Sequence, residues 1–296
     1  MRRSKEVFAN RVCLCQPKVR TMGGKKSMKR TERVGALIKI LTESPNRIYS
    51  LQYFCDLFGA AKSSVSEDIQ SASQAIAVTG SGYLETIAGS KGGVRFVPDI
   101  SQKEIEALQA EFSRRLVDPS RLLGGNFLYT SDIFYDSDLV TRTARVFTKK
   151  FQGCGADCVA TVETKGIPLA FTVAHMLGIP LAVIRREAKI SEGSTVSINY
   201  FSGSYDRLQK MSMSKRAIAP GAKVLIIDDF MRGGGSIVGI SEMIGEFSGT
   251  VVGVGVAIAS LTPEKKKISD YTCLVYLGEI HAEEKKISIL PNDSIF

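Results

Sequence analysis

The stretch VLIIDDFMRGGGS, which runs from Val224 to Ser236, constrains the fold of this chain more than any other segment. Its apolar residues 224–227 lead directly into two adjacent carboxylates, Asp228 and Asp229. A continuous apolar run of this kind is typical of a strand that is buried on both faces of a parallel sheet. Because such sheets bind ligands beyond the carboxyl ends of their strands, we expect both acids at a binding rim. There they can accept hydrogen bonds from the two vicinal hydroxyls of a ribose.

The glycines that follow predict an anion-binding loop. Gly233, Gly234 and Gly235 allow backbone N–H groups to converge on a phosphate at the start of the next helix, and Ser236 adds a hydroxyl. The spacing is neither that of a P-loop nor that of a dinucleotide-binding fold. The stretch therefore suits a sugar that carries a phosphate. The alternative is a plain strand-to-helix turn with solvated aspartates.

The surrounding sequence predicts an α/β domain. From about residue 127, continuous apolar strands alternate with helical segments, which indicates a parallel sheet flanked by helices on both faces. A polar helix with one apolar face precedes it at residues 101–116. Strands are expected at 158–162, 179–186, 224–227 and 251–259, and helices at 167–177 and 236–247.

Residues 30–97 predict three short helices and a β-hairpin, which is the element order of a winged helix-turn-helix. Ser50 is expected to cap the second helix, and Gly59 to end it. The third helix is expected to open with a capping box at Ser64–Glu67. Two strands, 83–88 and 93–97, then flank a glycine-rich turn.

The exposed start of the third helix is the candidate DNA-contacting surface. Hydroxyls and an amine there can reach base edges and phosphates, and a helix N-terminus favours phosphate. The alternative is a small helical dimerisation or interaction domain whose basic residues are ordinary surface. The candidate DNA-binding residues are Lys62, Ser63, Ser64 and Ser66 in this helix, with Lys91 and Arg95 in the wing.

Basic residues concentrate at the N-terminus. The chain has a net charge of +9, and residues 1–35 alone contain eleven Lys or Arg and two Glu, which is the same excess. Such a segment attracts nucleic acid, but Met28 directly precedes the first helical pattern, so the charge by itself decides little. We expect a tail over 1–28 that is disordered or an over-long start, a winged-helix DNA-binding domain over 29–98, and the α/β domain over 99–296.

Several classes of protein are excluded by composition. No apolar run approaches the length of a membrane span, and six scattered cysteines are too few for a disulfide framework, so we expect the reduced cytoplasm. The close pairs Cys13–Cys15 and Cys154–Cys158 have no histidine at metal-ligand spacing. Neither a metal site nor a bound cofactor is expected.

VLIIDDFMRGGGS resembles the phosphoribosyl pyrophosphate (PRPP) binding motif of the type I phosphoribosyltransferases. ETKGIPLA, residues 163–170, resembles the pyrophosphate loop of that family, and residues 191–216 resemble the flexible hairpin that closes over its site. Either Arg185 or Arg186 stands where the family has a phosphate-binding basic residue. The resemblance implies that PRPP binds to Thr164, Lys165, Gly166, Arg185, Arg186, Asp228, Asp229, Phe230, Met231, Arg232, Gly233, Gly234, Gly235 and Ser236, with Tyr200, Ser202, Gly203 and Ser204 in the flexible loop.

A winged helix joined to such a domain resembles the purine operon repressors of Gram-positive bacteria. AKSSVSEDI, TKGIPLA and IIDDFM carry this resemblance, which runs from about residue 29 to the C-terminus. It implies a homodimeric repressor that binds double-stranded operator DNA and takes PRPP as effector, not as substrate, with Mg²⁺ and guanosine tetraphosphate as further candidate ligands. Arg232, Gly233 and Ser236 replace Lys, Ala and Thr of the family pattern but keep charge, small size and hydroxyl. The alternative is an active purine phosphoribosyltransferase with an appended winged helix.

Overall fold

The chain folds into two units, Met1–Asp99 and Ile100–Phe296, each of which is described by itself. The structure is a computed structural model, and it describes residues 28–90, 92–124, 127–187, 190–202, 207–281, 283–284 and 286–296.

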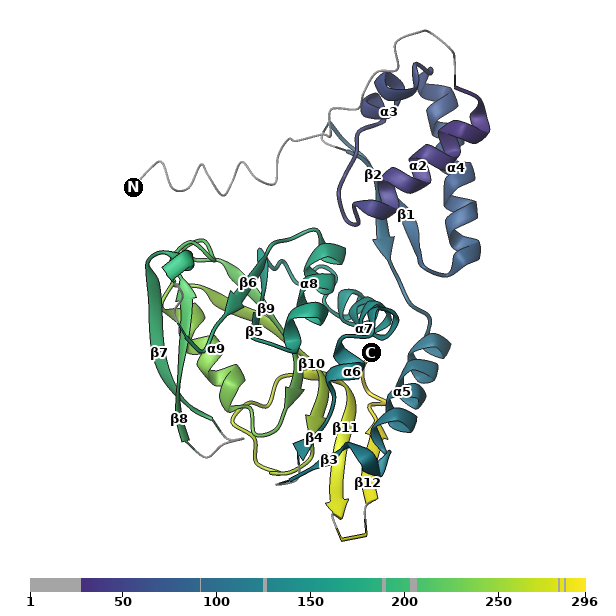
Figure 1. Cartoon of the computed structure of the whole chain (residues 1–296). Helices are drawn as coiled ribbons and strands as arrows, with labels where there is room; N and C mark the ends of the chain where they lie inside the picture. The colour runs from purple at the N-terminus through teal and green to yellow at the C-terminus, as the bar shows by residue number, and fades with distance from the viewer. Residues whose placement is uncertain are drawn as a thin grey trace. The chain divides into compact units, whose positions relative to one another are not determined.

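The N-terminal unit has the predicted order of three helices and a hairpin (Figure 1). The helices are α2 (Arg30–Glu43), α3 (Leu51–Phe58) and α4 (Lys62–Thr79), and the antiparallel strands are β1 (Gly82–Ile87) and β2 (Gly93–Pro98). The predicted ends of α3 are confirmed: the Ser50 hydroxyl accepts the N–H of Tyr53, and Gly59 ends the helix with a φ of 61°.

The predicted capping box at Ser64 is wrong. The helix α4 begins two residues earlier, at Lys62, and the extended residue before it, Ala61, offers no side-chain cap. Ser64 therefore lies inside the first turn and not at its entrance. The apolar face of α4 is nevertheless the one that its spacing predicts, because Val65 and Ile69 are buried in the core of this unit together with Ala72, Ile76, Leu37, Leu41, Phe54 and Phe96.

A buried ion pair joins α4 to α2. The carboxylate of Asp68 is fully buried, and it accepts hydrogen bonds from Arg33 Nε at 2.6 Å and Arg33 Nη2 at 3.2 Å. The third nitrogen of this guanidinium, Nη1, donates to the carbonyl oxygen of Met28 at 2.9 Å. The pair therefore fixes the start of α2 against the second turn of α4. The candidate DNA-contacting residues of this helix lie mainly on its first turn.

The C-terminal unit is built on a sheet whose described strands follow the order β12-β11-β10-β9-β5-β6. All neighbours are parallel except β12, which pairs antiparallel with β11 at the edge. The strands are β5 (Cys158–Val162), β6 (Leu181–Ile184), β9 (Lys223–Met231), β10 (Thr250–Ser260), β11 (Thr272–His281) and β12 (Lys286–Pro291).

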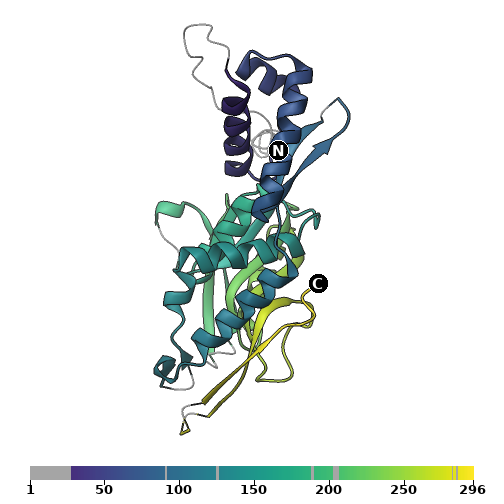
Figure 2. The ribbon, with the colours of Figure 1, turned by 90° about the vertical axis from the view of Figure 1, so that its right-hand side faces the viewer.

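Both faces of this sheet are covered, as the continuous apolar strands predict. Leu225 and Ile227 of β9 point into one core, and Val224 and Ile226 point into the other. Figures 1 and 2 show helices on the first face, which are α5 (Gln102–Leu116), α6 (Ser131–Phe134), α7 (Ser137–Lys150) and α8 (Gly166–Leu177). The second face packs against α9 (Gly235–Gly245) and the hairpin of β7 (Thr195–Ser202) and β8 (Arg207–Ser214).

The structure departs from the sequence-based expectation at five strands. The central strand β9 does not stop at Ile227 but pairs with β10 as far as Met231, so both acids belong to the strand. Neither β11 nor β12 was expected. Their sequences mix glycine, charged residues and short apolar stretches, which lack the continuous pattern of the central strands. A short hairpin of β3 (Leu122–Leu123) and β4 (Phe127–Leu128) precedes α6.

We predict that Asp68→Ala lowers the free energy of unfolding of the N-terminal unit by about 3–5 kcal/mol, because it leaves the Arg33 guanidinium desolvated and without its partner. The matched control is Glu43→Ala, which removes the exposed Lys39–Glu43 pair and is expected to cost at most ~1 kcal/mol. Hydrogen exchange of the α2 and α4 amides in the full chain measures both. Equal losses in the two variants would contradict the structural role of Asp68.

Candidate functional site

A cavity of about 630 Å³ lies at the carboxyl ends of the parallel strands. Its walls come from the ends of β5, β6, β9, β10 and β11, from the hairpin of β7 and β8, and from the chain just before α6. Its polar lining includes Glu163, Thr164, Lys165, Arg186, Asp228, Asp229, Arg232, Ser236, Ser260 and Thr262.

The two aspartates lie side by side in the wall of this cavity, Asp228 buried and Asp229 half-buried. Asp228 is 5% exposed, and its Oδ1 accepts the backbone N–H of Asp229 at 3.0 Å. Burial, and then the neighbouring Asp229, raise the pKa of Asp228 well above its usual value. Burial also raises the pKa of Asp229, against the lowering effects of its hydrogen bond with Asp228 and of the Lys165 ammonium. Both carboxylates therefore favour a ligand that brings hydrogen-bond donors.

Gly166 makes room for this pair. A Cβ atom at residue 166 would lie 2.2 Å from Asp228 Oδ1 and 2.5 Å from Thr161 Oγ1. Gly166 thus allows α8 to begin directly against the buried carboxylate. It was predicted as a ligand-binding residue, but it is not among the residues that line the cavity.

The glycine loop forms a recess beside the cavity, at the N-terminus of α9. Gly234 has a φ of 80°, a conformation that side chains rarely adopt, and a Cβ there would lie 3.2 Å from Ile268. The loop is held from outside, because the N–H of Lys267 donates to Gly233 O at 2.9 Å. The recess is lined by residues 230–237, which include the predicted Phe230, Met231, Arg232, Gly233, Gly234, Gly235 and Ser236.

Lys165, Arg185 and Arg186 each have a polar partner next to the cavity. Lys165 Nζ donates to Thr130 Oγ1 at 3.2 Å, and the backbone N–H of Arg186 donates to Glu163 Oε1 at 2.9 Å. Arg185 Nη1 donates to the other oxygen of Glu163 at 3.1 Å. Of the two arginines between which the sequence left the choice open, Arg186 lines the cavity and Arg185 does not.

The hairpin of β7 and β8 contributes one buried aromatic residue to the wall. Tyr200 is 4% exposed, and its hydroxyl donates to Gln209 Oε1 at 2.7 Å across the hairpin. Ser202 is the last residue of β7, while Gly203 and Ser204 lie outside the described residues.

The candidate DNA-binding residues gather mainly on the first turn of α4. Lys62, Ser63 and Ser66 are exposed there, and Ser64 is half-buried. In the wing, Arg95 Nε donates to Glu85 Oε2 at 2.6 Å, so its charge is partly neutralised on the protein itself. Lys91 lies outside the described residues.

Sequence reasoning missed a second wall of the cavity. Ser260 is the last residue of β10 and Thr262 lies two residues beyond it, so the rule that ligands bind at strand carboxyl ends could have identified them. Phe127, Leu128 and Thr130 carry no such signal, because a short hairpin brings them to the cavity. The end of β11, residues 277–281, was missed because that strand was not expected.

Within the part of the chain that the structure describes, no three His, Cys, Asp or Glu side chains gather in a way that could hold a metal ion. Among the same residues, no helix combines the length and the apolar character that crossing a membrane requires.

Comparison with known proteins assigns both units. The N-terminal domain model of the bacterial purine repressor matches residues 29–98, and the phosphoribosyl transferase domain model matches residues 138–285. The fold therefore combines a purine-repressor DNA-binding domain with a phosphoribosyltransferase domain.

Relatives that match most of the chain show to which family within this class of protein it belongs. The purine biosynthesis transcriptional repressor PurR of Bacillus subtilis is 38% identical over 261 residues, which cover 88% of this chain and 92% of that protein. The purine biosynthesis transcriptional activator PurR of Lactococcus lactis subsp. lactis is 34% identical over 262 residues, covering 88% and 97%. The xanthine phosphoribosyltransferase of Laribacter hongkongensis is 27% identical over 161 residues, covering 52% and 85%. The chain belongs to the family of the PurR transcriptional regulators of purine biosynthesis.

We predict that Asp228→Asn stabilises the ligand-free protein near neutral pH. The folded-state pKa of Asp228 is raised, so the unfolded chain loses its proton first, from about pH 3.9 upwards, and stability falls as pH rises through the folded-state value. Asparagine has no such loss. The expected gain in Tm at pH 7.5 is about 2–4 °C, the size of ~1 kcal/mol in a domain of this length.

Thermal melts between pH 4 and pH 8 test this prediction, and the gain should shrink as the pH falls towards 4. Asp157→Asn is the control, because Asp157 is exposed. A Tm difference between wild type and Asp228→Asn that stays constant with pH would contradict the expected titration.

Proposed function

We propose that this protein is a DNA-binding transcriptional repressor of purine biosynthesis genes. It acts as a homodimer in the cytoplasm, binds double-stranded operator DNA through α4 and the wing, and binds PRPP as an effector in its phosphoribosyltransferase unit. Membership of the PurR family supports the regulatory role. The activator among the relatives means that the sign of regulation needs its own measurement.

One observation carries the choice of effector: the twin acids line the cavity and the glycine loop lines the recess beside it, with Phe230, Arg232 and Ser236 lining both. The vicinal ribose hydroxyls would donate to Asp228 and Asp229, which are short of donors. The 5-phosphate would lie against the backbone amides of the glycine loop and the N-terminus of α9. The 1-diphosphate would meet the cationic side chains of Lys165 and Arg186. PRPP carries all of these groups on a single sugar.

Regulation then requires coupling between PRPP and DNA. If PRPP binds the DNA-free form more tightly, DNA must weaken PRPP binding by the same factor. One physical route is competition for charge, because Lys165, Arg186 and Arg232 attract any polyanion. Guanosine tetraphosphate also carries diphosphates, so the same site would accept it as a competitor of PRPP.

We predict that the full chain binds a labelled duplex from upstream of a purine synthesis gene and that PRPP at millimolar concentration or below releases it. Fluorescence anisotropy with and without Mg²⁺ measures this release and the role of the ion. Combined substitution of Asp228 and Asp229 by Ala should abolish the PRPP response and leave DNA binding intact. Unchanged anisotropy of the wild-type complex at saturating PRPP would refute the effector role. A reporter gene in cells lacking the protein tells repression from activation.

We also predict no nucleotide formation when the protein is incubated with PRPP, Mg²⁺ and hypoxanthine, guanine, xanthine or adenine. The enzyme relative matches only 52% of this chain, whereas the regulators match 88% and include the DNA-binding unit. Chromatography of the products measures turnover, with a purine phosphoribosyltransferase as positive control. Turnover that disappears in Asp229→Ala would support the enzyme alternative.

A further inference from the structure

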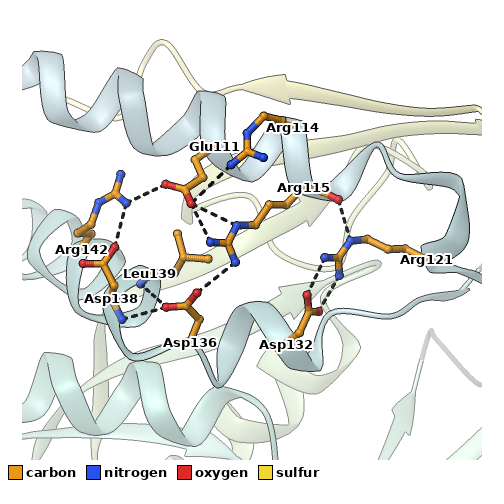
Figure 3. A network of polar contacts seen from close by, with 9 residues as sticks. All are labelled: Glu111, Arg114, Arg115, Arg121, Asp132, Asp136, Asp138, Leu139 and Arg142. Carbon is orange, nitrogen blue, oxygen red and sulfur yellow. Dashed lines mark hydrogen bonds and ion pairs between the residues drawn. The ribbon is translucent and has the colours of Figure 1, made fainter.

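A guanidinium clamp fixes the wall of the cavity that the hairpin of β3 and β4 provides. Arg121 Nη1 and Nη2 donate to the two carboxylate oxygens of Asp132, each at 2.6 Å (Figure 3). Arg121 Nε donates to Arg115 O at 2.7 Å, and Nη1 also donates to Tyr129 O at 3.0 Å. The N–H of Tyr129 returns a hydrogen bond to Arg121 O at 2.8 Å. One side chain thus ties the end of α5, the base of the hairpin and α6 together.

Thr130 directly follows Tyr129, the residue whose backbone the clamp holds. Thr130 is 4% exposed and lines the cavity. Its carbonyl oxygen accepts the N–H groups of Ile133 at 3.1 Å and Phe134 at 3.2 Å, and both of these side chains are buried in the core. The backbone of Thr130 is therefore held on one side by the clamp and on the other by α6. Its hydroxyl has a set position in the wall.

That hydroxyl accepts the hydrogen bond from Lys165 Nζ at 3.2 Å. The charge of this ammonium also acts on Asp229, whose pKa it lowers. A lysine attracted by Asp229 alone would turn towards the acids that we assign to the ribose hydroxyls. The Thr130 hydroxyl gives the ammonium a second partner, outside the ribose subsite, and thereby keeps it apart from the acids.

We propose that Thr130, held by the Arg121–Asp132 clamp, positions the Lys165 ammonium for a diphosphate and so sets the preference of the site for a sugar 1-diphosphate over a sugar monophosphate. Arg121, Asp132 and Thr130 are positioning residues, since they act through Lys165. This inference rests on the proposed function, because it takes PRPP as the occupant of the cavity.

The test compares two ligands by calorimetry on the full chain: PRPP, and ribose 5-phosphate, which lacks the diphosphate. The quantity compared is the Kd of ribose 5-phosphate divided by the Kd of PRPP. In Thr130→Val, which keeps the shape of the side chain but not its hydroxyl, this ratio should fall about three- to tenfold, because PRPP binds more weakly. The control is Thr148→Val, which removes a buried hydroxyl of α7 that has no hydrogen-bond partner among the described atoms and does not line the cavity. It should leave the ratio unchanged.

The clamp is tested separately. Asp132→Asn and Arg121→Lys should lower the same ratio, because neither an amide nor a primary ammonium reproduces the fork-to-carboxylate pair. Arg142→Gln is the matched control: Arg142 belongs to the same network, with Glu111 at 2.8 Å and Asp138 at 3.1 Å, but does not hold the hairpin (Figure 3). In a Lys165→Met background, Thr130→Val should have no further effect on the ratio, since the two residues act as one unit.

Each outcome decides the inference. Equal weakening of both ligands in Thr130→Val, or a further loss in the Lys165→Met background, would overturn it, because the hydroxyl would then act on the whole cavity or on the ligand directly. A wild-type ratio that Thr130→Val leaves unchanged would overturn it while sparing the proposed function. A wild-type chain that binds neither ligand would refute both. Thermal melting of each variant verifies that it is folded.

Discussion

The burial of a carboxylate at the end of a sheet strand is the constraint on which this site depends. Asp228 lies within β9, under α8, where burial and Asp229 oppose its ionisation. Two features of the chain permit this: Gly166 leaves space for the carboxylate, and Lys165 lowers the pKa of the neighbouring acid. The desolvation that makes the pair unfavourable in the empty protein also makes it a strong acceptor for ligand hydroxyls.

The sheet supplies the rigidity that such a pair needs. Successive residues of β9 enter different cores, so the strand that carries both acids is packed on each side before it reaches the cavity. Its pairing with β10 continues through Met231, which extends this support beyond the acids themselves. A carboxylate pair on a loose loop would relax towards water and lose its affinity for donors. The same strand therefore packs the core on both sides of the sheet and holds the two carboxylates in place.

Features that depend on residues close together in the sequence could be predicted, whereas contacts between distant residues could not. The strand, the acids and the glycine loop are contiguous, and the buried faces of α4 and α5 follow from helical spacing, so local pattern identified them. The hydrogen bond between Thr130 and Lys165 joins residues 35 apart in the chain, and it depends on a hairpin with two-residue strands. No periodicity marks it. The early start of α4 was missed for another reason: the helix begins without a side-chain cap, although Ser64 and Glu67 offer the capping pattern.

One part of the cavity wall comes from a contiguous motif, and another part comes from residues far apart in the sequence. This difference helps to explain how an enzyme fold can serve a regulator. A transferase must hold its ligand more tightly in the transition state than in the ground state, whereas a sensor gains from tight ground-state binding and from discrimination between related metabolites. Under the proposed function, the local motif would recognise what all phosphorylated pentoses share, namely hydroxyls and a phosphate. Discrimination would then come from the rest of the cavity, where the Thr130–Lys165 pair behind the Arg121 clamp is fixed from several elements at once. A sensor that reports a sugar diphosphate and not its hydrolysis product needs its ammonium held rigidly, and a bidentate ion pair among α5, the hairpin and α6 gives that rigidity without adding charge to the cavity itself.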